Sequence, residues 1–328
     1  MRTRKLGTTD LLMTTIGLGT ADIGGGRIYG WAPRDEAESI ATIHRALDLG
    51  INWLDTAPVY GVGHAEELVG RALDGRKDEV IIATKCDISG SSKSPSYSRT
   101  QDIRGQLEAS LKRLKVEAID LYQIHWPVQE DEAIEEAWSA IADLVREGKV
   151  RYAGVSNFSL RQLRRVQAIH PVASLQPPYS MLNREIEQGL LSYCAAHDIG
   201  VIVYSPMESG ILTGRFTREY VTSLPPGDWR LRNPHFLEPC LSATLAFVER
   251  LRPIAGGSGE TVGQLAIAWV LRRPEVTSAI VGARNPAQIE EMAPAGNWAL
   301  AGPEIAEIAA LFESLGETEM KEVPGING

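Results

Sequence analysis

Eight short apolar segments, separated by amphipathic stretches, constrain the fold of this 328-residue chain more than any other feature. Within each segment the Val, Ile and Leu residues run on instead of alternating strictly with polar ones, which is typical of strands buried on both faces. Strands that alternate with helices predict a parallel sheet, and eight such units close a (β/α)8 barrel, the TIM-barrel class of α/β fold. The segments are residues 14–20, 51–57, 79–86, 119–125, 150–156, 172–178, 199–205 and 276–283.

Helical patterns fill most of the intervals between these strands. In residues 34–49, Ile40, Ile43 and Leu47 share one face, and Gly50 follows the end. Acidic residues occupy the first turn, where the helix dipole favours them. The same reasoning predicts helices over residues 99–115, 131–147, 159–169, 185–197, 260–272 and 303–315.

Three segments depart from the alternation of strands and helices. An open doubly wound sheet usually carries GxGxxG after its first strand; residues 24–26 lack that spacing, so we interpret them as a loop over the barrel mouth. Residues 4–13 predict a hairpin that plugs the barrel floor. The long segment 213–240 favours a substrate-covering loop at the carboxyl-terminal face, with a mobile surface excursion as the alternative. We expect residues 1–328 to form one barrel domain.

Charge and cysteine content exclude several classes of protein. The formal net charge of −9 argues against nucleic acid or an anionic membrane as partner, because both require a basic surface. Cys86, Cys194 and Cys240 are far apart and lack CxxC spacing, which fits a reducing compartment. No apolar run approaches the ~20 residues of a membrane-spanning helix, and no apolar stretch follows the basic N-terminus. We therefore expect a cytoplasmic protein.

Ionisable side chains stand where successive predicted strands end, which is where enzymes of this fold carry their chemistry. Asp55, Lys85 and His125 end three such strands, and Tyr60 follows Asp55 by five residues. Each alone has an ordinary structural explanation, such as a helix cap, a solvated lysine or a packed histidine. Together they predict one polar cluster at the barrel mouth.

This set of residues suits general acid–base catalysis. A tyrosine, with an ordinary pKa of about 10, donates a proton poorly unless its phenolate is stabilised, and a neighbouring lysine ammonium stabilises it. A buried Lys85 requires a counter-charge, which Asp55 supplies, and His125 is placed to orient the substrate oxygen. Because the sequence shows neither a metal-ligand cluster nor a nucleophile elbow, we expect a bound nicotinamide as the electron source.

These motifs resemble those of the aldo-keto reductase family, in particular its bacterial and potassium-channel β-subunit-like branch, over almost the whole chain. The matching segments are DTAPVYG with HAEELVGRAL, then IIATK, DLYQIHWP and VRYAGVSNF. The resemblance implies a (β/α)8 barrel that interconverts carbonyls and alcohols with a nicotinamide cofactor, usually NADPH. It assigns Asp55, Tyr60, Lys85 and His125 to the family's catalytic positions, with Tyr60 as general acid/base.

The resemblance also implies the cofactor contacts. A guanidinium forks onto phosphate well, so Arg284 favours NADP(H), with NAD(H) as the alternative. Gly282 and Ala283 stand where many relatives have Lys and Ser, and Met292 stands where many have an adenine-binding Asn. The expected contacts are Ser156, Asn157, Gln176, Tyr204, Ser205, Met207, Gly210, Leu212, Arg215, Gly282, Ala283, Arg284, Gln288 and Glu291.

Substrate and reaction direction stay open at this stage. Trp31, Trp126 and Trp229 are predicted to line the substrate pocket, and the basic residues of the 213–240 segment to meet an anionic or hydroxyl-rich group. One alternative function is an NAD(P)+-dependent sugar or polyol dehydrogenase; another, from a different class, is an NADPH-binding regulatory or channel-associated subunit. The expected partner is a small carbonyl or alcohol, and the chain is either a monomer or a homo-oligomer.

Overall fold

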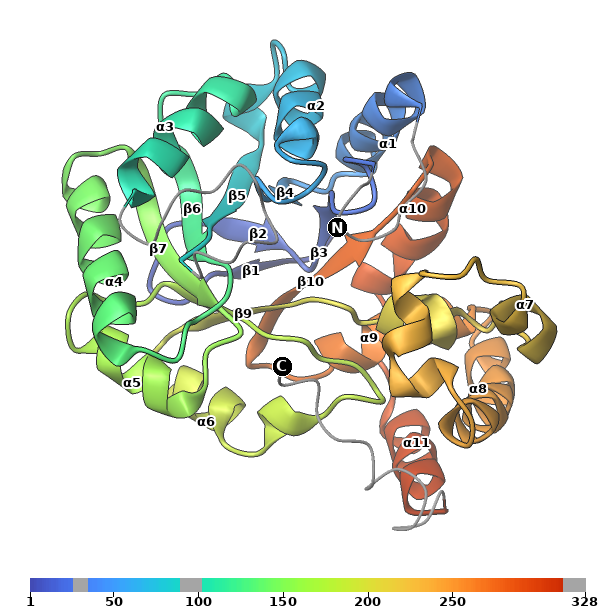
Figure 1. Cartoon of the computed structure of the whole chain (residues 1–328). Helices are drawn as coiled ribbons and strands as arrows, with labels where there is room; N and C mark the ends of the chain where they lie inside the picture. Colours follow the sequence, from blue (N-terminus) through green and yellow to red (C-terminus); the bar gives the residue numbers. More distant parts are fainter. Residues whose placement is uncertain (26–34, 89–101, 315–328) are drawn as a thin grey trace.

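Eight parallel strands form a closed barrel, as the sequence predicts (Figure 1). The computed structural model describes residues 1–25, 35–88 and 102–314. Around the barrel the strand order is β10-β3-β4-β5-β6-β7-β8-β9, so the last strand pairs with the first and no edge is left open. The strands are β3 (Ile16–Gly19), β4 (Trp53–Asp55), β5 (Ile81–Cys86), β6 (Ile119–Ile124), β7 (Val150–Ser156), β8 (Ser174–Gln176), β9 (Gly200–Val203) and β10 (Val276–Gly282).

An antiparallel hairpin precedes the barrel, formed by β1 (Thr3–Lys5) and β2 (Leu12–Thr14). Leu6, Leu11 and Met13 of this region are buried in one cluster with barrel residues such as Trp53 and Leu121. A Cβ added to Gly7 would lie 2.4 Å from the Asp198 carbonyl oxygen and 2.8 Å from the Gly200 nitrogen, at the start of β9. The hairpin therefore closes the amino-terminal end of the barrel, which confirms the predicted hairpin.

Helices surround the strands in Figure 1, and side-chain caps set where several of them begin. Asp35 accepts hydrogen bonds from the second and third amides of the first helix, and Ser159 and Thr261 form capping boxes. The helices expected from the sequence are α1 (Glu36–Asp48), α3 (Ile103–Leu114), α4 (Asp131–Arg146), α5 (Leu160–Gln167), α6 (Leu190–Ala196), α9 (Val262–Leu271) and α11 (Gly302–Ser314).

The structure corrects several sequence-based boundaries. The helix predicted over 185–197 is divided into η2 (Glu185–Glu187) and α6, because Gly189 adopts a φ of 113°. The sequence reasoning also did not predict helices α2 (His64–Ala72), α8 (Cys240–Gly257) and α10 (Pro286–Met292). Helix α8 contains Pro253, and α2 and α10 are too short for a clear periodic signal.

The segment 213–240, interpreted as a loop, contains short helices instead. They are α7 (Arg218–Thr222), η4 (Trp229–Arg232) and η5 (Pro234–Phe236). Phe216 packs edge-on against Phe236, with 5.4 Å between ring centroids, so the segment has a small apolar centre of its own. Of the residues that the sequence placed over the barrel mouth, Gly26 and Trp31 lie outside the described residues.

All three cysteines are free thiols, and two of them are buried. Burial raises the pKa of the Cys194 thiol to about 12. Within the described ranges, no helix combines the length and the apolar character that crossing a membrane requires.

Candidate active site

The ionisable residues predicted at strand ends meet at the carboxyl-terminal end of the barrel. Asp55 is the last residue of β4, Lys85 is the penultimate residue of β5, and His125 directly follows β6. Parallel pairing sets Asp55 beside Ala83 and Lys85 beside Gln123, so Lys85 and His125 each lie two residues further along the chain than the position that pairs with the preceding strand. The strand order of the barrel, and not sequence proximity, therefore brings them together.

Lys85 is at the centre of the cluster and is completely buried. Its Nζ donates to Asp55 Oδ1 at 2.6 Å, to the Thr56 carbonyl oxygen at 3.0 Å and to the Tyr60 hydroxyl at 3.4 Å. Gln176 Nε2 donates to the second carboxylate oxygen of Asp55 at 2.8 Å. The buried ion pair is thus satisfied by hydrogen bonds on both sides, which a buried pair needs in order to persist.

Tyr60 is positioned by a tight turn between β4 and α2. Its amide donates to the Ala57 carbonyl at 3.1 Å, and its own carbonyl accepts from the Ala65 amide at 3.2 Å, so the turn is fixed to the first residues of α2. The ring is half-buried and contacts His125 edge-on, with 5.8 Å between centroids. The phenol oxygen therefore lies within hydrogen-bond distance of Lys85, and the Tyr60 ring lies against that of His125.

Burial shapes the charges in this cluster. It lowers the pKa of Lys85 from its ordinary value, while the negative charge of Asp55 acts in the opposite direction. The pKa of His125 lies well below its ordinary value, first because of burial and second because of the positive charge of Lys85. The imidazole is therefore neutral at physiological pH and able to donate one hydrogen bond.

A second hydrogen-bond network adjoins the cluster on β7, β8 and β9. Asn157 Nδ2 donates to the His125 carbonyl oxygen at 2.9 Å, and the Tyr204 hydroxyl donates to Asn157 Oδ1 at 2.8 Å. Ser156 Oγ donates to the Gln176 carbonyl oxygen at 2.8 Å. Asn157 adopts a φ of 62°, a conformation that Asn tolerates better than most residues. The network fixes the half-buried Tyr204 ring at the barrel mouth.

The segment after β9 contains the next group of predicted cofactor contacts. It runs through η3 (Glu208–Thr213), where Leu212 is buried and Gly210 has a φ of 92°. Ser205 also has a left-handed φ, of 55°, and Met207 is half-buried. Arg215 forms an ion pair with Glu291 of α10, which links this segment to the last predicted group.

That last group lies between β10 and α10. Ala283 is buried, whereas Gly282 is exposed, and a Cβ added to Gly282 would lie 3.3 Å from Asp22 Oδ2. The Arg284 amide donates to Gln288 Oε1 at 2.8 Å, which shapes the turn into α10. The predicted cofactor residues thus stand at the carboxyl ends of β7, β8, β9 and β10 and in the segments that follow β9 and β10.

The predicted substrate residues are less concentrated. Trp126 is 45% exposed. The centroids of the Trp126 and His125 rings are 6.4 Å apart, and their planes form an angle of 27°. Trp229 begins η4 and is half-buried. Arg230 is paired with Asp228, so it is not available in this arrangement for an anionic substrate. The roles of the tryptophans stay predictions.

Sequence reasoning missed one buried acid close to this site. Glu66 on α2 is fully buried and accepts from Thr84 Oγ1 and from Arg113 Nε, each at 2.6 Å. Thr84 precedes Lys85 on β5, so Glu66 connects the helix after Tyr60 to the strand that carries the lysine. An acid on the apolar face of HAEELVG was the available signal.

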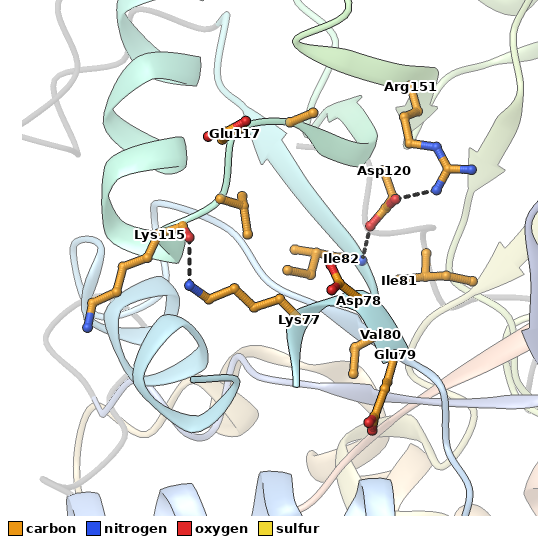
Figure 2. Close-up of a pocket in the computed structure, with 12 residues that line it drawn as sticks. Lys77, Asp78, Glu79, Val80, Ile81, Ile82, Lys115, Glu117, Asp120 and Arg151 are labelled. Atoms are coloured by element: carbon orange, nitrogen blue, oxygen red, sulfur yellow. Dashed lines mark hydrogen bonds and ion pairs between the residues drawn. The ribbon is translucent and has the colours of Figure 1, made fainter. Parts of the chain in front are cut away.

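A pocket of about 570 Å³ lies at the opposite, amino-terminal end of β5, β6 and β7 (Figure 2). Asp120 accepts from the Ile82 amide at 2.8 Å and from Arg151 Nη1 at 2.6 Å, and Lys77 Nζ donates to the Lys115 carbonyl at 2.8 Å. The polar groups of the pocket thus hydrogen-bond to other groups of its lining. In (β/α)8 barrels the amino-terminal end of the strands contributes to stability, and not to catalysis. The pocket is separate from the candidate active site.

The fold is a (β/α)8 barrel that carries a hydrogen-bonded cluster of ionisable side chains at the carboxyl ends of its strands, where barrel enzymes place their active sites. The chain belongs to the aldo/keto reductase family, whose sequence pattern matches residues 15–313. The resemblance noted in its motifs is thereby confirmed, and the protein is an oxidoreductase of carbonyls and alcohols.

Named relatives are similar over nearly the whole chain. The NADH-specific methylglyoxal reductase of Escherichia coli (strain K12) is 33% identical over 335 residues, which cover 96% of this chain and 99% of the relative. The structure of the glycerol dehydrogenase from Gluconobacter oxydans is 35% identical, with a TM-score of 0.86 and 95% of both chains covered. An aldo-keto reductase from Klebsiella pneumoniae in complex with NADPH is 27% identical, with a TM-score of 0.73, covering 95% of this chain and 95% of that one.

Proposed function

We propose that this protein is an NADP(H)-dependent oxidoreductase that interconverts an aldehyde or ketone and an alcohol, with Tyr60 as general acid/base. The observation that carries the proposal is the position of Lys85 Nζ, 2.6 Å from Asp55 Oδ1 and 3.4 Å from the Tyr60 hydroxyl. A cation this close stabilises negative charge on the phenol oxygen, so the phenol can give up its proton.

A nicotinamide, when bound, would supply the hydride that reduces the carbonyl carbon. Tyr60 delivers its hydroxyl proton to the carbonyl oxygen, and Lys85 stabilises the phenolate that remains. Asp55 keeps the ammonium charged in a buried position. The neutral His125 ring, held edge-on to Tyr60, donates a hydrogen bond that orients the substrate oxygen. In the oxidative direction the same groups act in reverse.

The residues present fit a nicotinamide nucleotide. Gln176 uses its Nε2 on Asp55 and so presents its side-chain carbonyl oxygen as an acceptor for a carboxamide. Ser156 and Asn157 lie beside it, and the fixed Tyr204 ring offers an apolar face for stacking. Met207 and Gly210 would approach the pyrophosphate, and Arg284 would fork onto a 2′-phosphate.

Relatives support a nicotinamide cofactor in either form. The Klebsiella pneumoniae structure is a complex with NADPH, and the Escherichia coli methylglyoxal reductase is NADH-specific. Arg284 favours NADP(H), because NAD(H) lacks the 2′-phosphate that this guanidinium would neutralise. Gln288 and Ala283 add no charge. NADP(H) is therefore the preferred cofactor, and NAD(H) is the alternative.

The test follows the near-ultraviolet absorbance of NADPH, and separately of NADH, with an activated aromatic aldehyde. We expect Tyr60→Phe to lower kcat by about 10²- to 10⁴-fold, while the Kd for NADPH stays near the wild-type value because the phenol acts in the chemical step. Tyr193→Phe, on α6 outside the barrel, is the matched control. A Tyr60→Phe enzyme with the wild-type rate would contradict the assignment.

A second candidate function is oxidation of a polyol or sugar alcohol with NAD(P)+. The similarity to the glycerol dehydrogenase from Gluconobacter oxydans favours it. The experiment supplies NADP+ or NAD+ with glycerol and other polyols and follows the rise in absorbance. If nucleotide binds tightly but neither direction shows turnover, the regulatory-subunit alternative gains support instead.

A further inference from the structure

Glu208 is a buried acid outside the catalytic cluster. It follows Met207 as the first residue of η3, and it is 8% exposed. Ser180 Oγ donates to its Oε2 at 2.8 Å, and Asn233 Nδ2 donates to its Oε1 at 3.3 Å. These donors come from two other segments, the loop after β8 and the link between η4 and η5. One carboxylate therefore joins three parts of the carboxyl-terminal face.

The backbone at this position is strained. Glu208, Ser209 and Gly210 have φ values of 45°, 58° and 92°, three left-handed residues in succession. Only the glycine adopts this conformation without a steric penalty, so the backbone at Glu208 and Ser209 is strained. Such a turn persists only when its surroundings hold it, and the two hydrogen bonds to the Glu208 carboxylate hold it from its first residue.

The same carboxylate anchors the segment between η4 and α8. Asn233 accepts from the His235 amide through its Oδ1 at 2.9 Å, so the residue that bonds Glu208 also caps η5. His235 is buried, and its Nδ1 lies 3.4 Å from Thr244 Oγ1 on α8. Phe236, the next residue, packs against Phe216 just beyond η3. Polar and apolar contacts thus attach η3 and the 229–237 segment to each other.

We propose that Glu208 is a positioning residue that holds η3 in its nucleotide-binding conformation and couples nucleotide binding to the order of residues 229–237. The inference rests on the proposed function, because η3 is the segment expected to face the cofactor pyrophosphate. Nucleotide contacts stabilise η3, and through Glu208 and Asn233 they stabilise the segment predicted to cover the substrate. The Tyr60 cluster is not part of this connection.

The first measurement is an NADPH titration by tryptophan fluorescence with wild type, Glu208→Ala and Glu208→Gln. Glu208→Ala should weaken NADPH binding by about tenfold, the loss expected for a pair of buried hydrogen bonds to a carboxylate. The NADPH affinity of Glu208→Gln should lie between those of wild type and Glu208→Ala, because the glutamine amide oxygen still accepts from Ser180. At saturating substrates kcat should stay near wild type. Glu219→Ala, on α7, is the matched control.

The second measurement is limited trypsin cleavage after Arg232, an exposed residue of the 229–237 segment. NADPH should slow this cleavage in wild type and should protect Glu208→Ala much less. If Glu208→Ala does not fold, Ser180→Ala removes one of the two donors and should show both effects more weakly. A Kd within about twofold of wild type, with unchanged protection, would overturn the coupling. Wild type that binds no nucleotide would instead overturn the proposed function.

Discussion

At the scale of single residues, the Lys85–Asp55 pair is the most informative feature. Both side chains are removed from water, with 0% and 4% of their surfaces exposed. Desolvating two charges costs several kcal/mol each, and a well-packed apolar pair is often at least as stable. The pair is therefore poorly explained by stability, and its contact with the Tyr60 hydroxyl gives it a chemical explanation.

Protonation of His125 is expected to control stability at acid pH. The pKa values of His125 and His235 are lowered in the folded protein, chiefly by burial. Below about pH 6.5 the unfolded chain takes up protons on these rings that the folded chain does not bind. Stability should be level above this pH and should fall on acidification, with a slope of up to about 1.4 kcal/mol per pH unit for each ring.

Urea unfolding between about pH 8 and pH 5 measures this dependence. His125→Gln should make stability fall less steeply on acidification, because Gln does not titrate and the contribution of one proton to the slope is lost. Identical slopes for wild type and variant would show that His125 is protonated equally in both states, contrary to the lowered pKa.

At the scale of elements, helix α2 is held in place by one buried acid. Arg113 of α3 reaches Glu66 past Gly63, where an added Cβ would lie 2.8 Å from the Arg113 Cδ. Glu66→Ala leaves Arg113 and Thr84 without their acceptor and should destabilise the protein by about 3 kcal/mol. Glu67→Ala, one position further on the exposed side of the helix, should cost less than about 0.5 kcal/mol. Chemical denaturation of both variants measures the two losses of stability, and equal losses would contradict a special role for Glu66.

The strands were predictable from sequence because their segments are rich in Val, Ile and Leu, and Asp55, Lys85 and His125 stand at or next to the carboxyl ends of those segments. The short helices were less predictable. Helix α2 has only nine residues, and α8 carries Pro253 within an otherwise helical pattern. The role of Glu208 had no sequence signal, because its partners Ser180 and Asn233 come together only through tertiary packing.

At the scale of the whole molecule, the hairpin is expected to contribute to stability and not to catalysis. Leu6 is buried and Leu12 is 54% exposed on the same hairpin, so they form a matched pair. Leu6→Ala should destabilise by about 2–5 kcal/mol, whereas Leu12→Ala should change stability by less than about 0.5 kcal/mol. Thermal unfolding measures both, and KM should be unchanged in each. A raised KM for Leu6→Ala would show that the barrel floor and mouth are coupled.

The pairing of β10 with β3 makes closure of the barrel a late event in the synthesis of the chain. A growing polypeptide can pair β3 through β9 in order, but both outer strands keep unsatisfied amide and carbonyl groups until residues 276–282 leave the ribosome. Such edges attract strands from other nascent copies. A chain cut short before β10 is therefore expected to aggregate, and the yield of soluble protein is expected to depend on how quickly residues 204–282 are translated.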